Sequence, residues 1–214
     1  TIIHLKLNVG GKPDANTKDL AYWHYSVHNP KSAVSHFEGA VVNINASDFY
    51  SENISYVNDW GLEAQNGPQA LALKTKADRI AFYNCKFRSF QDTWMTTTRD
   101  ADRHYVKECW LEGAVDYFYG GGNALVEEST LYNVRSGSVI VAPCHESVKY
   151  GYVFRNCVID GNEQAADGKL KLGRPWHNSP KAVYINTLVK IPLAPEGWTN
   201  MGTIPALFAE YNSM

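Results

Sequence analysis

The chain has 214 residues, of which 44% are hydrophobic and 20% are charged, a composition typical of a globular protein with room for a sizeable core. Its formal net charge of −2 gives no support to nucleic-acid binding or to attachment to an anionic membrane. No apolar run approaches the ~18 residues of a membrane-spanning helix. We therefore expect one domain over residues 1–214, with no nucleic-acid partner and no membrane span.

The first forty residues differ from the rest of the chain. Thr1 to Val9 form a strand-like run with no cap or lead-in, as if the numbering began inside a domain. Residues 10–39 are polar and are expected to form a loop-like insertion. His24 and His28 have the spacing of metal ligands on a helix, but no third ligand is suitably placed, so we interpret them as surface histidines.

A weak six-residue motif recurs from residue 51 onward. Its copies are SENISY (51–56), FYNCKF (82–87), VKECWL (106–111), VEESTL (126–131), FRNCVI (154–159) and YINTLV (184–189). The third position is always Asn or Glu, the fourth is mostly small, and the sixth is always apolar. The fourth positions are 31, 24, 20, 28 and 30 residues apart, which is typical of a solenoid built from short strands.

Further strand candidates lie between the copies of the motif. They read QALALK (69–74), SVIVA (138–142) and KLKLG (169–173), and no helical period runs through residues 40–190. One coil should therefore contain more than one strand, which predicts an all-β parallel β-helix.

Three of the four cysteines, Cys85, Cys109 and Cys157, lie in apolar runs and are interpreted as buried small residues. No CxxC occurs, so a zinc site has no support.

Two aspartates occupy the same phase of two copies. Asp92 follows Cys85 by seven residues, and Asp116 follows Cys109 by seven residues. If both coils keep register, the two carboxylates stand on adjacent strands, about 5 Å apart. Like charges at that distance cannot both ionise easily, so one pKa rises and the other falls. Such a pair supplies an acid together with a base or nucleophile near neutral pH.

Other polar residues suit the same site. Arg174, in LGRPW, can pair with one aspartate and keep it ionised. Trp176 lies two residues further on, on the same side of an extended strand, where it could stack on a sugar ring. Gln91 precedes Asp92, and Gln69 opens the preceding strand candidate. Their neutral amides are donors of the kind that an oxyanion requires.

The blocks QALALK, QDT, GAVDYFYG and LGRPW, in this order, resemble the signature of the pectin methylesterases, the carbohydrate esterases of family 8. FYNCKF, YGYVFRNCVID and APEGW followed by FAEYN are supporting matches. The resemblance covers most of residues 40–212. It implies a right-handed parallel β-helix, in agreement with the repeat, and a pectin or methylated oligogalacturonide substrate.

The resemblance also implies roles by position. Asp116 would be the nucleophile that attacks the methyl ester of a galacturonate unit. Asp92 would be the general acid toward departing methanol and then the base that activates water. Gln91 and Gln69 would hold the oxyanion of the tetrahedral intermediate. This route is nucleophilic catalysis by a carboxylate, and it requires no metal and no cofactor.

The remaining site residues follow from the same comparison of motifs. Arg174 would fix Asp116, and Trp176 would form part of the sugar-binding wall. The family usually has Leu-Tyr after QDT where this chain has Trp94 and a methionine, and Tyr119 adds a hydroxyl where a phenylalanine edge is expected. We assign Trp94 and Tyr119 to substrate binding.

The opening coils and the N-terminal cap of the family have no counterpart before the first residue, so we expect a partial domain.

Two other interpretations stay open. The machinery could act on a different ester or a thioester, or the β-helix could bind carbohydrate without catalysis, although the complete set of polar site residues argues against the second. Polysaccharide lyases and polygalacturonases share the β-helix but would not account for LGRPW together with QDT. A pectin substrate would place the protein outside the cell or in a periplasm.

Overall fold

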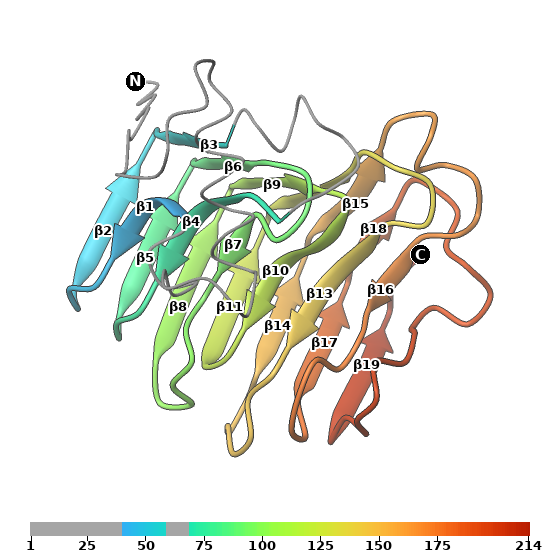
Figure 1. Cartoon of the computed structure of the whole chain (residues 1–214). Coiled ribbons are helices and arrows are strands. Elements are labelled where there is room, and N and C mark those ends of the chain that lie inside the picture. Colours follow the sequence, from blue (N-terminus) through green and yellow to red (C-terminus); the bar gives the residue numbers. More distant parts are fainter. Residues whose placement is uncertain (1–39, 59–68) are drawn as a thin grey trace, which may run out of the picture.

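Strands are the only regular elements in the described part of the chain, which comprises residues 40–58 and 69–214 of a computed structural model (Figure 1). The same part contains no helix that is long and apolar enough to cross a membrane. The expected strand at Thr1 to Val9, the insertion at 10–39, and His24 and His28 lie outside the described residues.

The strands form three sheets, and every pairing recorded between them is parallel. The first sheet contains, in spatial order, β1 (Ala40–Ile44), β4 (Leu71–Thr75), β7 (Trp94–Met95), β10 (Val115–Gly120), β13 (Val139–Pro143) and β16 (Lys171–Gly173). The second contains β2 (Phe49–Glu52), β5 (Ile80–Tyr83), β8 (Arg103–Lys107), β11 (Asn123–Glu127), β14 (Tyr152–Arg155), β17 (Lys181–Ile185) and β19 (Leu207–Tyr211). The third contains β3 (Ser55–Val57), β6 (Lys86–Arg88), β9 (Trp110–Gly113), β12 (Thr130–Asn133), β15 (Val158–Gly161) and β18 (Leu188–Val189).

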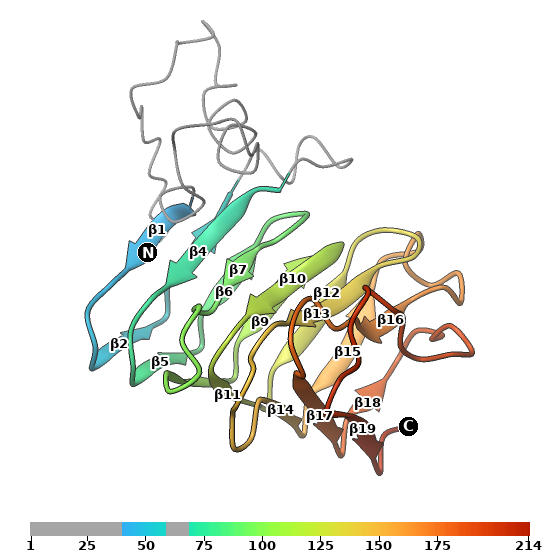
Figure 2. The ribbon, with the colours of Figure 1, turned by 60° about the horizontal axis from the view of Figure 1, so that its bottom comes forward.

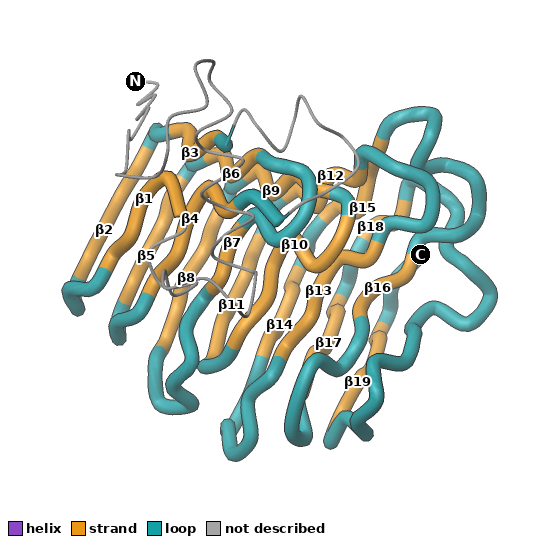
Figure 3. Tube along the Cα trace, viewed as in Figure 1, coloured by secondary structure: helices purple, strands orange, loops and turns teal. Residues whose placement is uncertain are grey.

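Consecutive strands along the chain belong to different sheets, so each coil adds one strand to each sheet from β1 to β18 (Figure 2). The fold is a right-handed parallel β-helix, which confirms the predicted fold class. The three strand candidates between the repeats become β4, β13 and β16, all in the first sheet. Figure 3 shows how the turns and longer loops project from the ends of the stacked strands.

The repeated motif coincides with the register of the coils. Its sixth positions are successive Cα partners in the third sheet, in the order Tyr56, Phe87, Leu111, Leu131, Ile159 and Val189. Its small fourth positions also stack: the Cys85 N–H donates to Cys109 Sγ at 3.3 Å, and the Cys109 N–H donates to Ser129 Oγ at 3.0 Å. Cys85, Cys109 and Cys157 are buried, as predicted.

The third position of the motif makes the turn between the second and third sheets. Its backbone is left-handed in every copy, with φ between 47 and 59°, at Asn53, Asn84, Glu108, Glu128, Asn156 and Asn186. Asparagine tolerates this conformation better than most residues. Neighbouring amides also bond to each other, since Asn84 Nδ2 donates to Asn53 Oδ1 at 2.7 Å and Asn186 Nδ2 donates to Asn156 Oδ1 at 3.3 Å. The turn therefore favours the recurring Asn but also accepts Glu, at Glu108 and Glu128.

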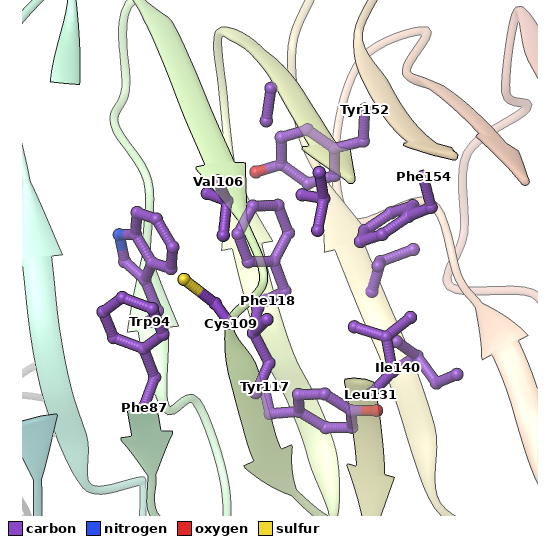
Figure 4. Packing of buried hydrophobic residues seen from close by; sticks show 14 of the residues in the cluster. Phe87, Trp94, Val106, Cys109, Tyr117, Phe118, Leu131, Ile140, Tyr152 and Phe154 are labelled. Atoms are coloured by element: carbon purple, nitrogen blue, oxygen red, sulfur yellow. The ribbon is translucent and has the colours of Figure 1, made fainter. Parts of the chain in front are cut away.

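Aromatic and aliphatic side chains fill the interior of the coils (Figure 4). Trp94 is among them: it is 0% exposed, its Nε1 donates to Thr75 Oγ1 at 3.1 Å, and its ring packs against Phe87 and Phe118. It pairs with Leu73 and Phe118, which also point inward. The assignment of Trp94 to substrate binding is therefore wrong, because its phase on β7 places it in the core.

Candidate functional site

A cleft of about 170 Å³ lies on the outer face of the first sheet, over β7, β10, β13 and β16. Its walls are formed by Gln69, Gln91, Asp92, Asp116, Tyr119, Ala142, Arg174, Trp176 and Met201. Seven of the eight residues singled out in the sequence thus meet in one place, and Trp94 is the exception. Residues 47 or more positions apart, such as Gln69 and Asp116, come together because each coil stacks directly on the one before it.

The two aspartates stand opposite each other on adjacent strands. Gln91 bridges to Val115, and Trp94 pairs with Phe118. In both pairs the partners are 24 positions apart in the sequence, which is also the separation of Asp92 and Asp116. The Asp92 N–H donates to the Val115 carbonyl oxygen at 2.9 Å. The strands are therefore in register at this point, with the ordinary sheet spacing of about 4.8 Å between their backbones.

Both aspartates have a left-handed backbone, with φ of 60° at Asp92 and 51° at Asp116. At Asp116 the pairing with β13 shifts between Val115 and Phe118, in the manner of a β-bulge. Tyr117 and Phe118 both join the core, whereas Asp116 lines the cleft. The distortion thus breaks the in–out alternation and turns a carboxylate outward between buried neighbours. The same break after Asp92 explains why Trp94, two residues on, does not share its face.

Arg174 makes the pair asymmetric. Its Nε donates to Asp116 Oδ1 at 2.9 Å and a terminal nitrogen donates to Asp116 Oδ2 at 2.6 Å, a bidentate arrangement. Burial raises the pKa of Asp92 well above its ordinary value, and the neighbouring Asp116 raises it further. Burial also raises the pKa of Asp116, but its hydrogen bonds and ion pair with Arg174 oppose that rise. The arrangement therefore favours a proton on Asp92 and a negative charge on Asp116.

Two aromatic rings close one side of the cleft. The centroids of Tyr119 and Trp176 are 5.6 Å apart, with the ring planes inclined by 65°. Burial, followed by the charges of Asp92 and Asp116, raises the pKa of the Tyr119 phenol well above its ordinary value. The hydroxyl therefore stays protonated and can act as a donor. Trp176 and Arg174 both line the cleft, as expected for residues two apart on an extended segment.

Two primary amides complete the polar lining. Gln69 and Gln91 are on consecutive coils, and the N–H of Ala70 donates to the Gln91 carbonyl oxygen at 2.9 Å, which aligns the two segments. An ionised carboxylate, a protonated carboxyl and amide donors in one small hollow are the parts needed for nucleophilic attack with acid catalysis. Within residues 40–58 and 69–214, His, Cys, Asp and Glu side chains form no metal-binding group of three or more.

Two lining residues were missed in the sequence. Ala142 is on β13, beside Tyr119 in the strand register, so strand alternation could have identified it once β13 was aligned. Met201 comes from the loop after APEGW and reaches the cleft from outside the sheet. Nothing local in the sequence marks it, because its position depends on how this loop folds back over β16.

Comparison with known proteins agrees with this architecture. The family model described as Pectinesterase matches residues 24–212. Pectinesterase 31 of Arabidopsis thaliana is 36% identical over 179 residues, covering 81% of this chain and 53% of the relative. Probable pectinesterase A of Aspergillus niger is 33% identical over 184 residues, covering 82% and 53%. The chain spans about half the length of these curated relatives.

Solved structures of pectin methylesterases also superpose on this chain. The pectin methylesterase from Aspergillus niger, in its penultimately deglycosylated form, superposes with a TM-score of 0.74 at 30% identity, covering 84% of this chain and 59% of that one. The pectin methylesterase from carrot also has a TM-score of 0.74, at 22% identity, covering 85% and 60%. The second likeness supports the β-helix alone.

Proposed function

The chain belongs to the pectinesterase family, and from this premise we propose that it hydrolyses the methyl esters of galacturonate units in pectin to free carboxylate and methanol. The observation that carries the proposal is the asymmetric pair of aspartates. Asp116 is held by two bonds from Arg174, while Asp92 is buried beside it without such a partner among the described residues. One carboxyl is thus prepared to attack and the other to donate a proton.

In the proposed first step, an oxygen of the Asp116 carboxylate forms a bond to the carbonyl carbon of the methyl ester. The carbonyl oxygen becomes an oxyanion, and the side-chain amides of Gln91 and Gln69 donate hydrogen bonds to it. The bond from carbon to the methoxy oxygen then breaks. Asp92 gives its proton to that oxygen, methanol leaves, and an acid anhydride joins Asp116 to the galacturonate unit.

In the second step, Asp92 is ionised and acts as a base. It takes a proton from a water molecule as the water oxygen attacks the galacturonate carbonyl of the anhydride. The bond to Asp116 breaks, which restores the carboxylate beside Arg174 and releases free galacturonate. We assign Trp176 and Tyr119 to holding the sugar against the cleft during both steps. A substrate of this kind is found outside the cell, and we propose that the protein works there or in a periplasm.

The proposal is tested by methanol release from methylated pectin. The parent protein should release methanol, and Asp116→Asn should lower the rate by roughly 10⁴-fold or more, because an amide cannot form the anhydride. Activity that survives this substitution would remove Asp116 from its role. A parent protein that binds methylated oligogalacturonide but releases no methanol would instead indicate a carbohydrate-binding β-helix, and hydrolysis of other esters alone would indicate a changed substrate.

A further inference from the structure

The hydroxyl group of Tyr119 differs from those of the other buried tyrosines. Four other tyrosines in the described part of the chain are at most 6% exposed, and the hydroxyl of each has a hydrogen-bond partner within the protein. The partners are Ser51 for Tyr56, Asn133 for Tyr117, Thr96 for Tyr152 and the carbonyl oxygen of Leu172 for Tyr184. Tyr119 is 4% exposed and lines the cleft, yet no described residue bonds its hydroxyl. Since buried hydroxyls are normally bonded, this one is available to a group that takes part in the reaction.

Tyr119 stands next to the strand that follows Asp92. It pairs on β10 with Met95 on β7, and each of these two residues comes three positions after an aspartate of the pair, Asp116 and Asp92 respectively. Gln91, by contrast, comes directly before Asp92. The hydroxyl and the glutamine amides therefore approach the two aspartates from opposite directions along the strands.

Asp92 requires a hydrogen-bond donor once it has lost its proton. Most other donors of the cleft have a different acceptor: two nitrogens of Arg174 bond Asp116, and the two glutamine amides are proposed to hold the oxyanion. Trp176 follows β16, so β10 and β13 lie between its segment and β7. The Tyr119 hydroxyl is thus the donor that the fold leaves for Asp92 among the described residues of the cleft.

The charges around this hydroxyl agree with that assignment. After burial, the charge of Asp92 and then that of Asp116 raise the pKa of Tyr119, so the phenol keeps its proton near neutral pH and can donate it in a hydrogen bond. The charged groups that act on Asp92 are Asp116, which raises its pKa, and Arg174, which lowers it. A hydrogen bond to the ionised form of Asp92 would add to the effect of Arg174.

We propose that Tyr119 is a further catalytic residue, whose hydroxyl donates a hydrogen bond to the carboxylate of Asp92 as Asp92 gives its proton to the departing methanol. The inference rests on the proposed function, since this proton transfer belongs to its first step. The proton passes from Asp92 to the methoxy oxygen, and the phenol keeps its own. The hydrogen bond strengthens as negative charge develops on Asp92, so it stabilises the transition state more than the resting enzyme.

Tyr119→Phe tests the proposal because it removes the hydroxyl and keeps the ring. Phenylalanine is also the residue that the family resemblance leads one to expect at this position, so the variant should fold. In a titration of ¹³C-labelled aspartate carboxyl groups followed by NMR, the signal that is missing in Asp92→Asn belongs to Asp92. In Tyr119→Phe, the apparent pKa at which this signal titrates should rise by about one unit.

The rate of the first step gives the second readout. With enzyme in saturating excess over methylated oligogalacturonide, the single-turnover rate of methanol release should fall by about tenfold in Tyr119→Phe, because Asp92 becomes a weaker acid. Tyr56→Phe is the matched control, since Tyr56 is 6% exposed on β3 and donates to Ser51 Oγ at 2.9 Å, outside the cleft. It should lower the free energy of unfolding and leave both readouts at their parent values.

An unchanged titration of Asp92 in Tyr119→Phe overturns the proposal, because the hydroxyl then does not bond that carboxylate. A rise in KM with an unchanged single-turnover rate also overturns it, since Tyr119 would then act only by holding the sugar. A parent protein that releases no methanol defeats the proposed function instead. The titration needs no turnover, so it still shows in that case whether the hydroxyl bonds Asp92.

Discussion

The left-handed turns and the cleft use the same unusual backbone conformation for opposite purposes. Asn84 and Asn186, at the turns, have φ of 47 and 51°, and Asp92 and Asp116, in the cleft, have φ of 60 and 51°. The turn residues are exposed and their amides bond to one another along the coils. The cleft residues are 8% and 6% exposed, and their carboxyl groups repel one another.

The difference lies in the side chain and not in the backbone. Stacked amides are each donor and acceptor, so a repeat of identical coils satisfies them at every level. Stacked carboxylates are acceptors only, so the same repeat forces one of them to keep a proton or to find a cation. Arg174 forms its ion pair, at 2.6 Å, with Asp116. A stabilising turn and the pair of aspartates that we propose to be catalytic thus share one repeated backbone geometry.

Asp92→Asn places an amide of the kind found at the turns into the cleft, and among the substitutions that compare these two regions it should have the largest effect. The rate of methanol release should fall by about 10²- to 10⁴-fold, because the amide neither donates a proton to methanol nor takes one from water. Asn156→Asp, which makes the reverse change at a left-handed turn, should leave kcat/KM unchanged. Comparable losses in both variants would show that the backbone conformation, and not the carboxyl group, matters to catalysis.

The same substitution should also change stability with pH. The pKa of Asp92 is raised in the folded state above the value of 3.8 that applies to an unperturbed carboxyl, so the folded protein binds the proton more tightly than the unfolded chain. The stability that the folded protein gains from this proton is fully present below pH ~4 and is lost as pH rises through the folded pKa of Asp92. Relative to the parent, Asp92→Asn should therefore gain about 1.4 kcal/mol of stability for each pH unit between pH ~4 and the folded pKa of Asp92.

Denaturant unfolding of parent and variant across pH 4–8 measures this difference. The free energy of unfolding of Asp92→Asn should exceed that of the parent only slightly near pH 4, and the difference should increase toward neutral pH. A gain that is constant with pH would place its origin in hydrogen bonding and not in the charge.

Arg174→Lys should have a smaller effect on the rate. A lysine keeps the positive charge but cannot make the two parallel bonds that orient both oxygens of Asp116, so kcat/KM should fall by roughly 10- to 100-fold. The matched control is Arg88→Lys, because Arg88 also bonds a carboxylate, Glu112, through two nitrogens at 3.0 and 3.1 Å. It lies on β6, outside the cleft, and its variant should keep the parent rate.

Glu108→Asn extends the asparagine pattern of the turns and should have the smallest effect. Glu108 has φ of 54°, and its coil follows that of Asn84. Asparagine tolerates this backbone better and can donate to the Asn84 amide oxygen, so the free energy of unfolding should rise by about 0.5 kcal/mol despite the loss of the bond from Tyr83. Glu108→Gln, an amide without that tolerance, should not stabilise the protein in the same denaturant titration.

Much of the site could be predicted because its two aspartates occupy equivalent positions of a local sequence repeat. Seven residues separate Cys85 from Asp92 and Cys109 from Asp116, and the small side chains that stack at the cysteines keep the two coils in register. The prediction for Trp94 was wrong for an equally local reason: the left-handed backbone of Asp92, two residues earlier, breaks the alternation of the strand, and no spacing rule marks that break. Sequence spacing predicts a face only where the strand is regular.

The sequence by itself determined the parallel β-helix, the stacking of its coils and the pair of aspartates, because hydrophobic alternation and small residues at fixed positions act over a few neighbouring residues. The spacing of the residues left open which aspartate would bond Arg174, and the tertiary structure brings Arg174 to Asp116, 58 residues away along the chain. It also decided that Met201 lines the cleft and that a second hollow, lined in part by Trp198 and Phe208, lies beside it. Loops that return across the sheet make these contacts, and their paths are fixed by bonds to distant backbone groups that no local pattern encodes.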